Sequence, residues 1–205
     1  MLIQTKSEQF KKHKIRWSPE KPLCLPESLR GPIPSMVTIT VIGDSRVGKS
    51  SLIRRFKTDK FTGGYKHTPG TEITQIVKTL HDDSSSKVCF HFLDTSDVFI
   101  DSSTVVPGMN DHVHASFSSY VLIVYDITDH RSFESAKDWM HLVRNMMLTD
   151  VTLVLVANKA DLEQQRQVHR TAGQVFATLN GMVFVETSAK SGHNLKSLFN
   201  YVTDI

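Results

Sequence analysis

From about residue 36 onward, apolar and polar positions follow two different patterns along this chain. Short continuous runs of apolar and β-branched residues predict buried strands, and two such runs on either side of the polar turn HDDSSS predict a hairpin. The six predicted strands cover residues 37–42, 72–80, 87–93, 120–127, 151–157 and 182–185.

Between these strands, apolar residues recur at the spacing of one buried helix face. After residue 127 they are Phe133, Ala136, Met140, Leu142, Val143 and Met147. The predicted helices cover residues 49–57, 133–147, 168–179 and 194–205, and Asn180-Gly181 is a suitable end for the third. Alternating strands and helices indicate an α/β fold with a mixed, mostly parallel six-stranded sheet flanked by helices. Ligands of such sheets bind at the carboxyl ends of the strands.

Residues 1–36 differ in composition from the rest of the chain. They hold seven Lys or Arg against three Glu, and five of the seven prolines, which argue against continuous helix or strand there. We therefore expect a basic, Pro-rich extension, flexible or partly docked, before a domain over residues 37–205. A basic arm can contact acidic lipid or nucleic acid, although a solvated tail is the simpler interpretation, and we expect no nucleic-acid partner.

The sequence predicts neither a membrane span nor a secretory signal. No apolar run approaches the roughly 18–20 residues that cross a bilayer, and the N-terminus lacks an apolar signal core. Cys24 and Cys89 lie far apart, which favours free thiols in a reducing compartment, so we expect a cytoplasmic protein. The chain ends in YVTDI without a lipidation motif. Either a tail is missing from this sequence, or peripheral membrane contact comes through partners or the basic arm.

A phosphate-binding motif follows the first predicted strand and opens the first predicted helix. GDSRVGKS fits G-x-x-x-x-G-K-[ST], the P-loop of nucleoside triphosphatases, in the context that the pattern requires. In such a loop Lys49 contacts the β- and γ-phosphates and the Ser50 hydroxyl binds Mg²⁺. The predicted phosphate-binding residues are Gly43, Asp44, Ser45, Arg46, Val47, Gly48, Lys49, Ser50 and Ser51.

Two further motifs indicate guanine rather than adenine. Asp161, in Asn158-Lys-Ala-Asp161, follows a predicted strand and can accept two hydrogen bonds from guanine, a donor pair that adenine lacks. Lys159 can cover the ring with its stem, and Asn158 can tie this segment to the P-loop. Ser188-Ala189-Lys190 follows the last strand and can supply a backbone N–H for guanine O6. A P-loop ATPase or kinase is the alternative, and it would require Asp161 to be incidental.

These motifs resemble those of the Ras superfamily of small GTPases, and their sequences are most similar to the Rab branch. The resemblance covers about four-fifths of the chain. The matching segments are GDSRVGKSSL, LIVYDITDHRSFESAKDWM, LVANKADL and FVETSAKSG. The resemblance implies a small G domain that switches between GTP and GDP with Mg²⁺, usually in vesicle traffic. It also implies effector and regulatory proteins that bind switch I, residues 58–72, and switch II, residues 95–116.

The resemblance assigns roles to three more residues. Thr68 matches the switch I threonine that binds Mg²⁺ when the γ-phosphate is present, and Phe61 matches the aromatic residue that packs on guanine. Asp94 matches the aspartate that holds Mg²⁺ through water. Pro69-Gly-Thr-Glu72 departs from the family's I-G-V-D and stiffens the segment that effectors read.

Switch II departs further. Where the family reads D-T-A-G-Q-E, this chain has Asp97 at the glycine position and Val98 at the catalytic glutamine position. Valine cannot orient water, and a carboxylate at Asp97 would face the phosphates. Candidate replacements for the glutamine are Arg46, Asp101, Asp111, His112 and His114, each with a surface role as the simpler interpretation. We expect slow or absent unaided hydrolysis; the alternative is a non-cycling nucleotide-binding scaffold.

Overall fold

The computed structural model describes residues 35–64, 72–79, 87–94, 119–146 and 151–203. The chain divides into two compact units, residues 1–33 and 34–205, and every described residue belongs to the second. The described helices include none that is long and apolar enough to cross a membrane.

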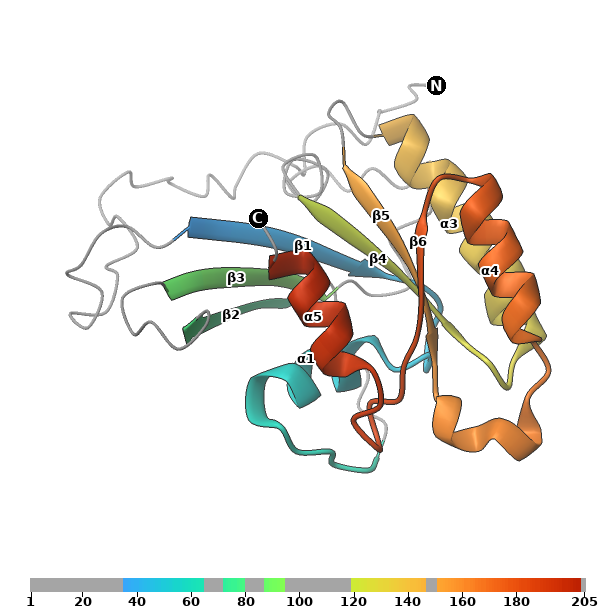
Figure 1. Ribbon diagram of the computed structural model, residues 1–205, viewed down its shortest axis with the longest axis horizontal. Helices are drawn as coiled ribbons and strands as arrows, with labels where there is room; N and C mark the ends of the chain where they lie inside the picture. The colour runs from blue at the N-terminus through green and yellow to red at the C-terminus, as the bar shows by residue number, and fades with distance from the viewer. Residues whose placement is uncertain (1–34, 65–71, 80–86, 95–118, 147–150, 204–205) are drawn as a thin grey trace, which may run out of the picture. The chain divides into compact units, whose positions relative to one another are not determined.

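Six strands form one sheet in the second unit (Figure 1). The strands are β1 (Ser35–Ile42), β2 (Glu72–Thr79), β3 (Lys87–Asp94), β4 (Tyr120–Asp126), β5 (Thr152–Asn158) and β6 (Val183–Glu186). Their order is β2-β3-β1-β4-β5-β6, and only the edge pair β2–β3 is antiparallel. The predicted α/β class, the mostly parallel sheet and its antiparallel edge are therefore confirmed.

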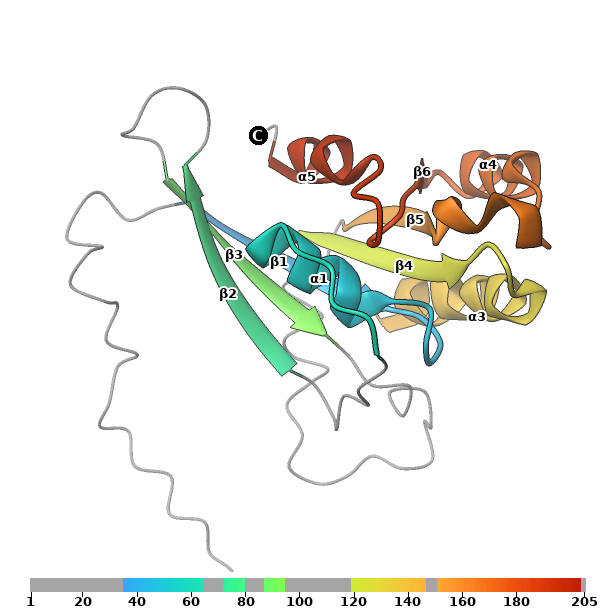
Figure 2. The same ribbon diagram turned by 90° about the horizontal axis from the view of Figure 1, so that it is seen from below.

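Helices cover both faces of this sheet, and Figure 2 shows α3 and α5 on opposite sides of it. The helices are α1 (Lys49–Thr58), α3 (His130–Met146), α4 (Arg170–Leu179), α5 (Leu195–Thr203) and the 3-10 helix η3 (Ala160–Gln165). On one face α1 and α5 pack together, and the Phe56 and Phe199 rings stack with centroids 3.7 Å apart. On the other face α3 and α4 cover a second apolar cluster that includes the fully buried Trp139 and Tyr125.

The predicted element boundaries agree with the observed ones to within about three residues. The helix predicted at 168–179 begins at Arg170, and it ends at the predicted Asn180-Gly181, where Gly181 has a φ of +57°. The helix η3 was not predicted, because its residues show no apolar spacing and none of them is buried. Residues 204 and 205 of the last predicted helix lie outside the described residues.

Candidate functional site

The carboxyl ends of the parallel strands bring the sequence motifs to one edge of the sheet. The P-loop follows β1, Asp126 ends β4, Asn158 ends β5 and Thr187 follows β6. Asp126 and Asn158 are direct partners in the β4–β5 register, and the Thr187 N–H donates to the Ala157 carbonyl at 2.8 Å. Segments more than a hundred residues apart in sequence therefore line one site.

Lys49 occupies the centre of the P-loop. It is the first residue of α1 and is only 7% exposed. Its Nζ donates to the carbonyl oxygens of Gly43, at 2.7 Å, and Asp44, at 2.8 Å. These two bonds curl the loop around the ammonium group, so the positive charge lies inside the turn, at the N-terminus of a helix, where anions bind favourably.

The two glycines of the motif are required by close packing as well as by backbone conformation. Gly48 has a φ of +100°, and a Cβ there would lie 2.4 Å from Asn158 Nδ2. Gly43 has a φ of +138°, and a Cβ there would lie 2.2 Å from the Val124 carbonyl oxygen. Any side chain at either position would push the P-loop away from β4 or from Asn158.

Asn158 joins three segments of the site. It is 1% exposed, and its Nδ2 donates to the Val47 carbonyl oxygen at 2.8 Å. Its Oδ1 accepts from the Ala189 N–H at 3.3 Å and from the Thr187 hydroxyl at 3.4 Å. The side chain thus joins the end of β5 to the P-loop and to the loop after β6. The sequence predicted the link to the P-loop.

Asp161 lies at the rim, next to the loop after β6. Its Oδ1 accepts from the Ser188 hydroxyl at 2.6 Å, and the Lys190 ammonium is 3.9 Å from Oδ2. Ser188 Oγ in turn accepts from the Ser191 N–H at 3.0 Å. These contacts fix the carboxylate as an acceptor pair at the mouth of the site.

Lys159, between Asn158 and Asp161, forms an ion pair across the sheet edge. Its Nζ lies 2.5 Å from Asp126 Oδ2. The Lys159 side chain is 32% exposed and the Asp126 side chain 10%. The sequence motif predicted Lys159 but not its partner.

Asp94, the last residue of β3, is a buried carboxylate close to the P-loop. It is 4% exposed, and its pKa is raised by burial, while a hydrogen bond from the Ser50 side chain and the Lys49 charge act in the opposite direction. Its Oδ1 has no hydrogen-bond partner among the residues that the structure describes. A buried, charged oxygen in this position costs free energy unless a ligand or a water molecule supplies its missing hydrogen-bond partner.

Comparison with known proteins identifies the family. A model of the Ras family matches residues 38–205. The chain belongs to the Ras family. It is also 35% identical over 179 residues to human EF-hand calcium-binding domain-containing protein 4B, a match that covers 85% of this chain and 23% of that protein. The chain therefore spans less than a quarter of that relative's length.

Membership in the Ras family makes the chain a small GTPase that binds guanine nucleotide. Whether the residues around Asp94 suit Mg²⁺ can be judged from their ligand atoms. Mg²⁺ prefers oxygen ligands and keeps several waters. The Ser50 hydroxyl and the buried Asp94 carboxylate offer one direct ligand and one acceptor for a bound water. The described part of the chain contains no group of three or more His, Cys, Asp or Glu that could hold a metal without such a hydroxyl and water. Ser50 and Asp94 thus fit Mg²⁺.

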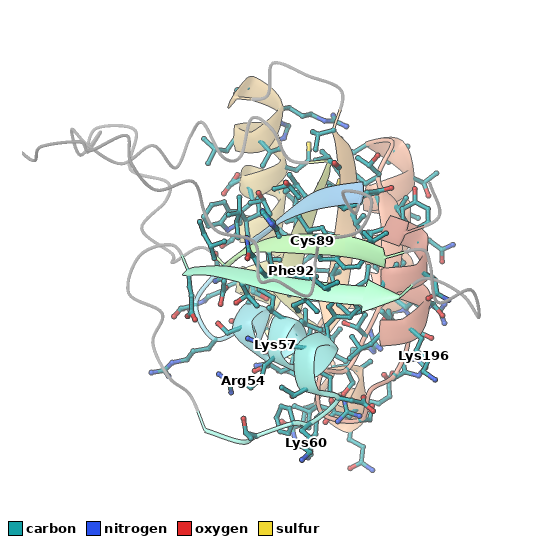
Figure 3. The ribbon with its side chains drawn as sticks, turned by 90° about the vertical axis from the view of Figure 1, so that its left-hand side faces the viewer. Arg54, Lys57, Lys60, Cys89, Phe92 and Lys196 are labelled. Atoms are coloured by element: carbon teal, nitrogen blue, oxygen red, sulfur yellow. The ribbon has the colours of Figure 1, made fainter. Side chains whose placement is uncertain are left out.

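The loop after α1 of this small GTPase carries Phe61, which is 40% exposed. Arg54 on α1 (labelled in Figure 3) anchors this loop by donating from Nη1 to the Thr62 hydroxyl at 2.8 Å. The loop is therefore held to α1 one residue after Phe61, which presents the aromatic ring at the surface.

Several predicted site residues lie outside the described residues. They are Thr68, Asp97, Val98, Asp101, Asp111, His112 and His114. Arg46 is described: it is exposed and has a φ of +63°, a conformation that non-glycine residues adopt infrequently.

Two residues that touch the site were missed at the sequence level. Trp139, on α3, is 1% exposed, and its Nε1 donates to Asp44 Oδ1 in the P-loop at 3.1 Å. Asp126 is the partner of Lys159 described above. Both lie in the segment YDITDHRSFESAKDWM, whose resemblance to the family was recognised without roles for its single residues.

Proposed function

We propose that this small GTPase binds GTP and GDP with Mg²⁺ as a molecular switch and hydrolyses GTP slowly or not at all without a partner. The main support for nucleotide binding is that Lys49, Asn158 and the Asp161–Ser188 pair lie together at one edge of the sheet. Lys49 places a positive charge in the phosphate loop, while Asp161 offers guanine its two acceptors. Adenine would cover these acceptors without offering them donors, which disfavours its binding.

In this proposal each residue of the nucleotide site binds a particular part of the ligand. The P-loop, residues 43–51, holds the phosphates, with Lys49 at the β- and γ-phosphates. Phe61 and the Lys159 stem cover the base, and Ser188, Ala189 and Lys190 form the pocket for its edge. Ser50, Asp94 through water, and Thr68 in the triphosphate state would hold Mg²⁺, which neutralises the phosphate charge when bound.

The proposed weakness in hydrolysis comes from switch II. Val98 has no hydrogen-bonding atom in its side chain, so the water that attacks the γ-phosphate is not oriented from this position. Asp97 adds a like charge, and two such charges 4 Å apart repel by about 4 kcal/mol at an effective dielectric constant of 20. These two substitutions equally support the second candidate, a nucleotide-stabilised scaffold that does not cycle.

The cellular role rests on the resemblance to the Rab branch. We propose a function in vesicle or intracellular traffic, in the cytoplasm or peripherally on an internal membrane. Effectors and regulators would bind residues 58–72 and 95–116, and the basic extension over residues 1–36 would add contact to partners or acidic lipid.

The first test identifies the nucleotide that copurifies with the chain and follows its turnover. We expect bound GDP or GTP, and single-turnover hydrolysis that rises about tenfold or more when Asp97→Gly and Val98→Gln are combined. The matched control is Asp97→Gly with Val98 retained, which removes the charge without supplying an amide. Copurified ATP would contradict guanine recognition, and wild-type hydrolysis as fast as the double variant's would contradict the catalytic defect.

The same protein separates the switch from the scaffold. Partner capture with GDP and with a non-hydrolysable GTP analogue gives different sets of bound proteins for a switch. Identical sets would favour the scaffold.

A further inference from the structure

We infer that Asp126 is a positioning residue of the guanine site, which holds the Lys159 side chain in its base-covering conformation before nucleotide arrives. This inference rests on the proposed guanine site and adds to it a residue from β4. Asp126 belongs to neither the P-loop nor the Asn158–Asp161 segment. Its carboxylate nevertheless lies 2.5 Å from the Lys159 ammonium.

The Asp126 carboxylate is held from both sides. Oδ2 faces Lys159, while Oδ1 accepts from the Thr128 N–H at 2.9 Å and from the Thr128 hydroxyl at 2.8 Å. The backbone of Asp126 is fixed as well, because its N–H donates to Ser132 Oγ at 3.0 Å. With both oxygens engaged and the backbone pinned to the start of α3, the carboxylate has one orientation.

Lys159 is constrained at its other end too. Its φ of +65° places its backbone in the left-handed region, a conformation that costs free energy for most residues other than glycine and asparagine. The flanking backbone holds that conformation: the Ile127 N–H donates to the Asn158 carbonyl at 3.1 Å, and the Leu162 N–H to the Lys159 carbonyl at 2.8 Å. The four-carbon stem is therefore fixed at its backbone and at its ammonium.

A lysine stem fixed at both ends loses rotational freedom before the ligand binds. A free lysine would lose that freedom on nucleotide binding, which weakens affinity. The ion pair also neutralises the ammonium beside a mostly buried carboxylate, and removal of either partner leaves the other without a counter-charge. Asp126 thus favours nucleotide retention through Lys159.

The test measures dissociation of a fluorescent GDP analogue from four forms of the full chain: wild type, Asp126→Asn, Lys159→Met and the double variant. Lys159→Met keeps an apolar stem of similar length but lacks the ammonium. We expect Asp126→Asn to raise the dissociation rate about tenfold in the wild-type background. In the Lys159→Met background we expect the same substitution to change it less than about twofold, because the group on which Asp126 acts is gone. Asp129→Asn is the matched control, since the carboxylate of this exposed neighbour accepts from the Arg131 N–H and the substitution leaves the backbone bonds of Asp129 to Asp126 and Ser132 in place.

Each outcome decides between positioning and a purely structural role. An unchanged rate for Asp126→Asn, or equal effects in both backgrounds, would overturn the inference. If Asp126→Asn does not fold, Thr128→Val loosens the same carboxylate by removing one bond, and a two- to threefold faster dissociation is expected while an unchanged rate overturns the inference. A wild-type chain that binds no guanine nucleotide overturns the proposed function as well, so the two failures are distinguishable.

Discussion

At the scale of single residues, the small GTPase keeps a charged group in a position that destabilises the empty protein. Asp94 is 4% exposed, and one of its oxygens has no partner among the described residues. Burial raises its pKa, so the folded chain binds the proton more tightly than the unfolded chain does. This group therefore adds stability at low pH, and that contribution is lost as the pH rises through the folded pKa. A site that needs a ligand for full stability is a common property of binding proteins.

Asp94→Asn is expected to stabilise the nucleotide-free chain at pH 7 by about 1 kcal/mol, because the buried charge is replaced by a neutral amide of the same shape. Urea unfolding in a chelator, without nucleotide, measures the difference. Acidification should narrow that difference, since the wild-type carboxyl then takes up a proton. In the presence of Mg²⁺ and nucleotide we expect the opposite order, with weaker Mg²⁺ affinity in the variant. A variant less stable than wild type under both conditions would contradict this account.

At the scale of elements, the apolar pattern predicted the strands and helices well because α3 buries one face, whereas the central strands β4 and β5 are buried on both. In α3 the expected Phe133, Ala136, Met140 and Val143 are buried. The helix η3 escaped prediction since it buries nothing, and its position depends on backbone bonds such as the Ala160 N–H to the Thr187 carbonyl at 2.9 Å. Local pattern contains no information on such contacts between distant segments.

The site, like the fold, could be predicted only in part from the sequence. Motifs with fixed spacing named Lys49, Asn158 and Asp161 directly, because their chemistry requires those residue types. Trp139 and Asp126 contact the site across 95 and 33 positions of sequence, respectively. Such pairings depend on how β4 and α3 pack beside the P-loop, which only the assembled sheet determines.

Trp139→Phe tests whether α3 supports the P-loop. Phenylalanine fills most of the same space but lacks the N–H that bonds Asp44 Oδ1 at 3.1 Å. Since hydrogen bonds to charged groups contribute about 1.5 kcal/mol or more, we expect nucleotide dissociation to accelerate about tenfold or more. Stopped-flow release of a fluorescent GDP analogue measures the rate. Asp138→Asn, at an exposed neighbouring position on α3, serves as the control, and equal rates for Trp139→Phe and wild type would sink the idea.

At the scale of the whole molecule, charge and chemistry are divided between the two units. Residues 1–33 hold all seven basic and three acidic residues of the extension, a net charge of +4, whereas the whole chain has +3. The second unit is therefore close to neutral, at −1. The described site contacts lie entirely within residues 34–205, from the P-loop bonds of Lys49 to the Asp161–Ser188 pair.

Deletion of residues 1–33 is therefore expected to leave nucleotide binding intact. Strand β1 begins at Ser35, and its register with β3, from Ser35 opposite Val88 onward, is retained in the shortened chain. We expect the dissociation rate of GDP to change less than about twofold, and the free energy of unfolding by less than about 0.5 kcal/mol, as for changes away from a core. Fluorescent GDP release and urea unfolding of both chains provide the comparison. A tenfold faster release from the shortened chain would mean that the extension completes the nucleotide site, and would move the boundary of the functional domain to include it.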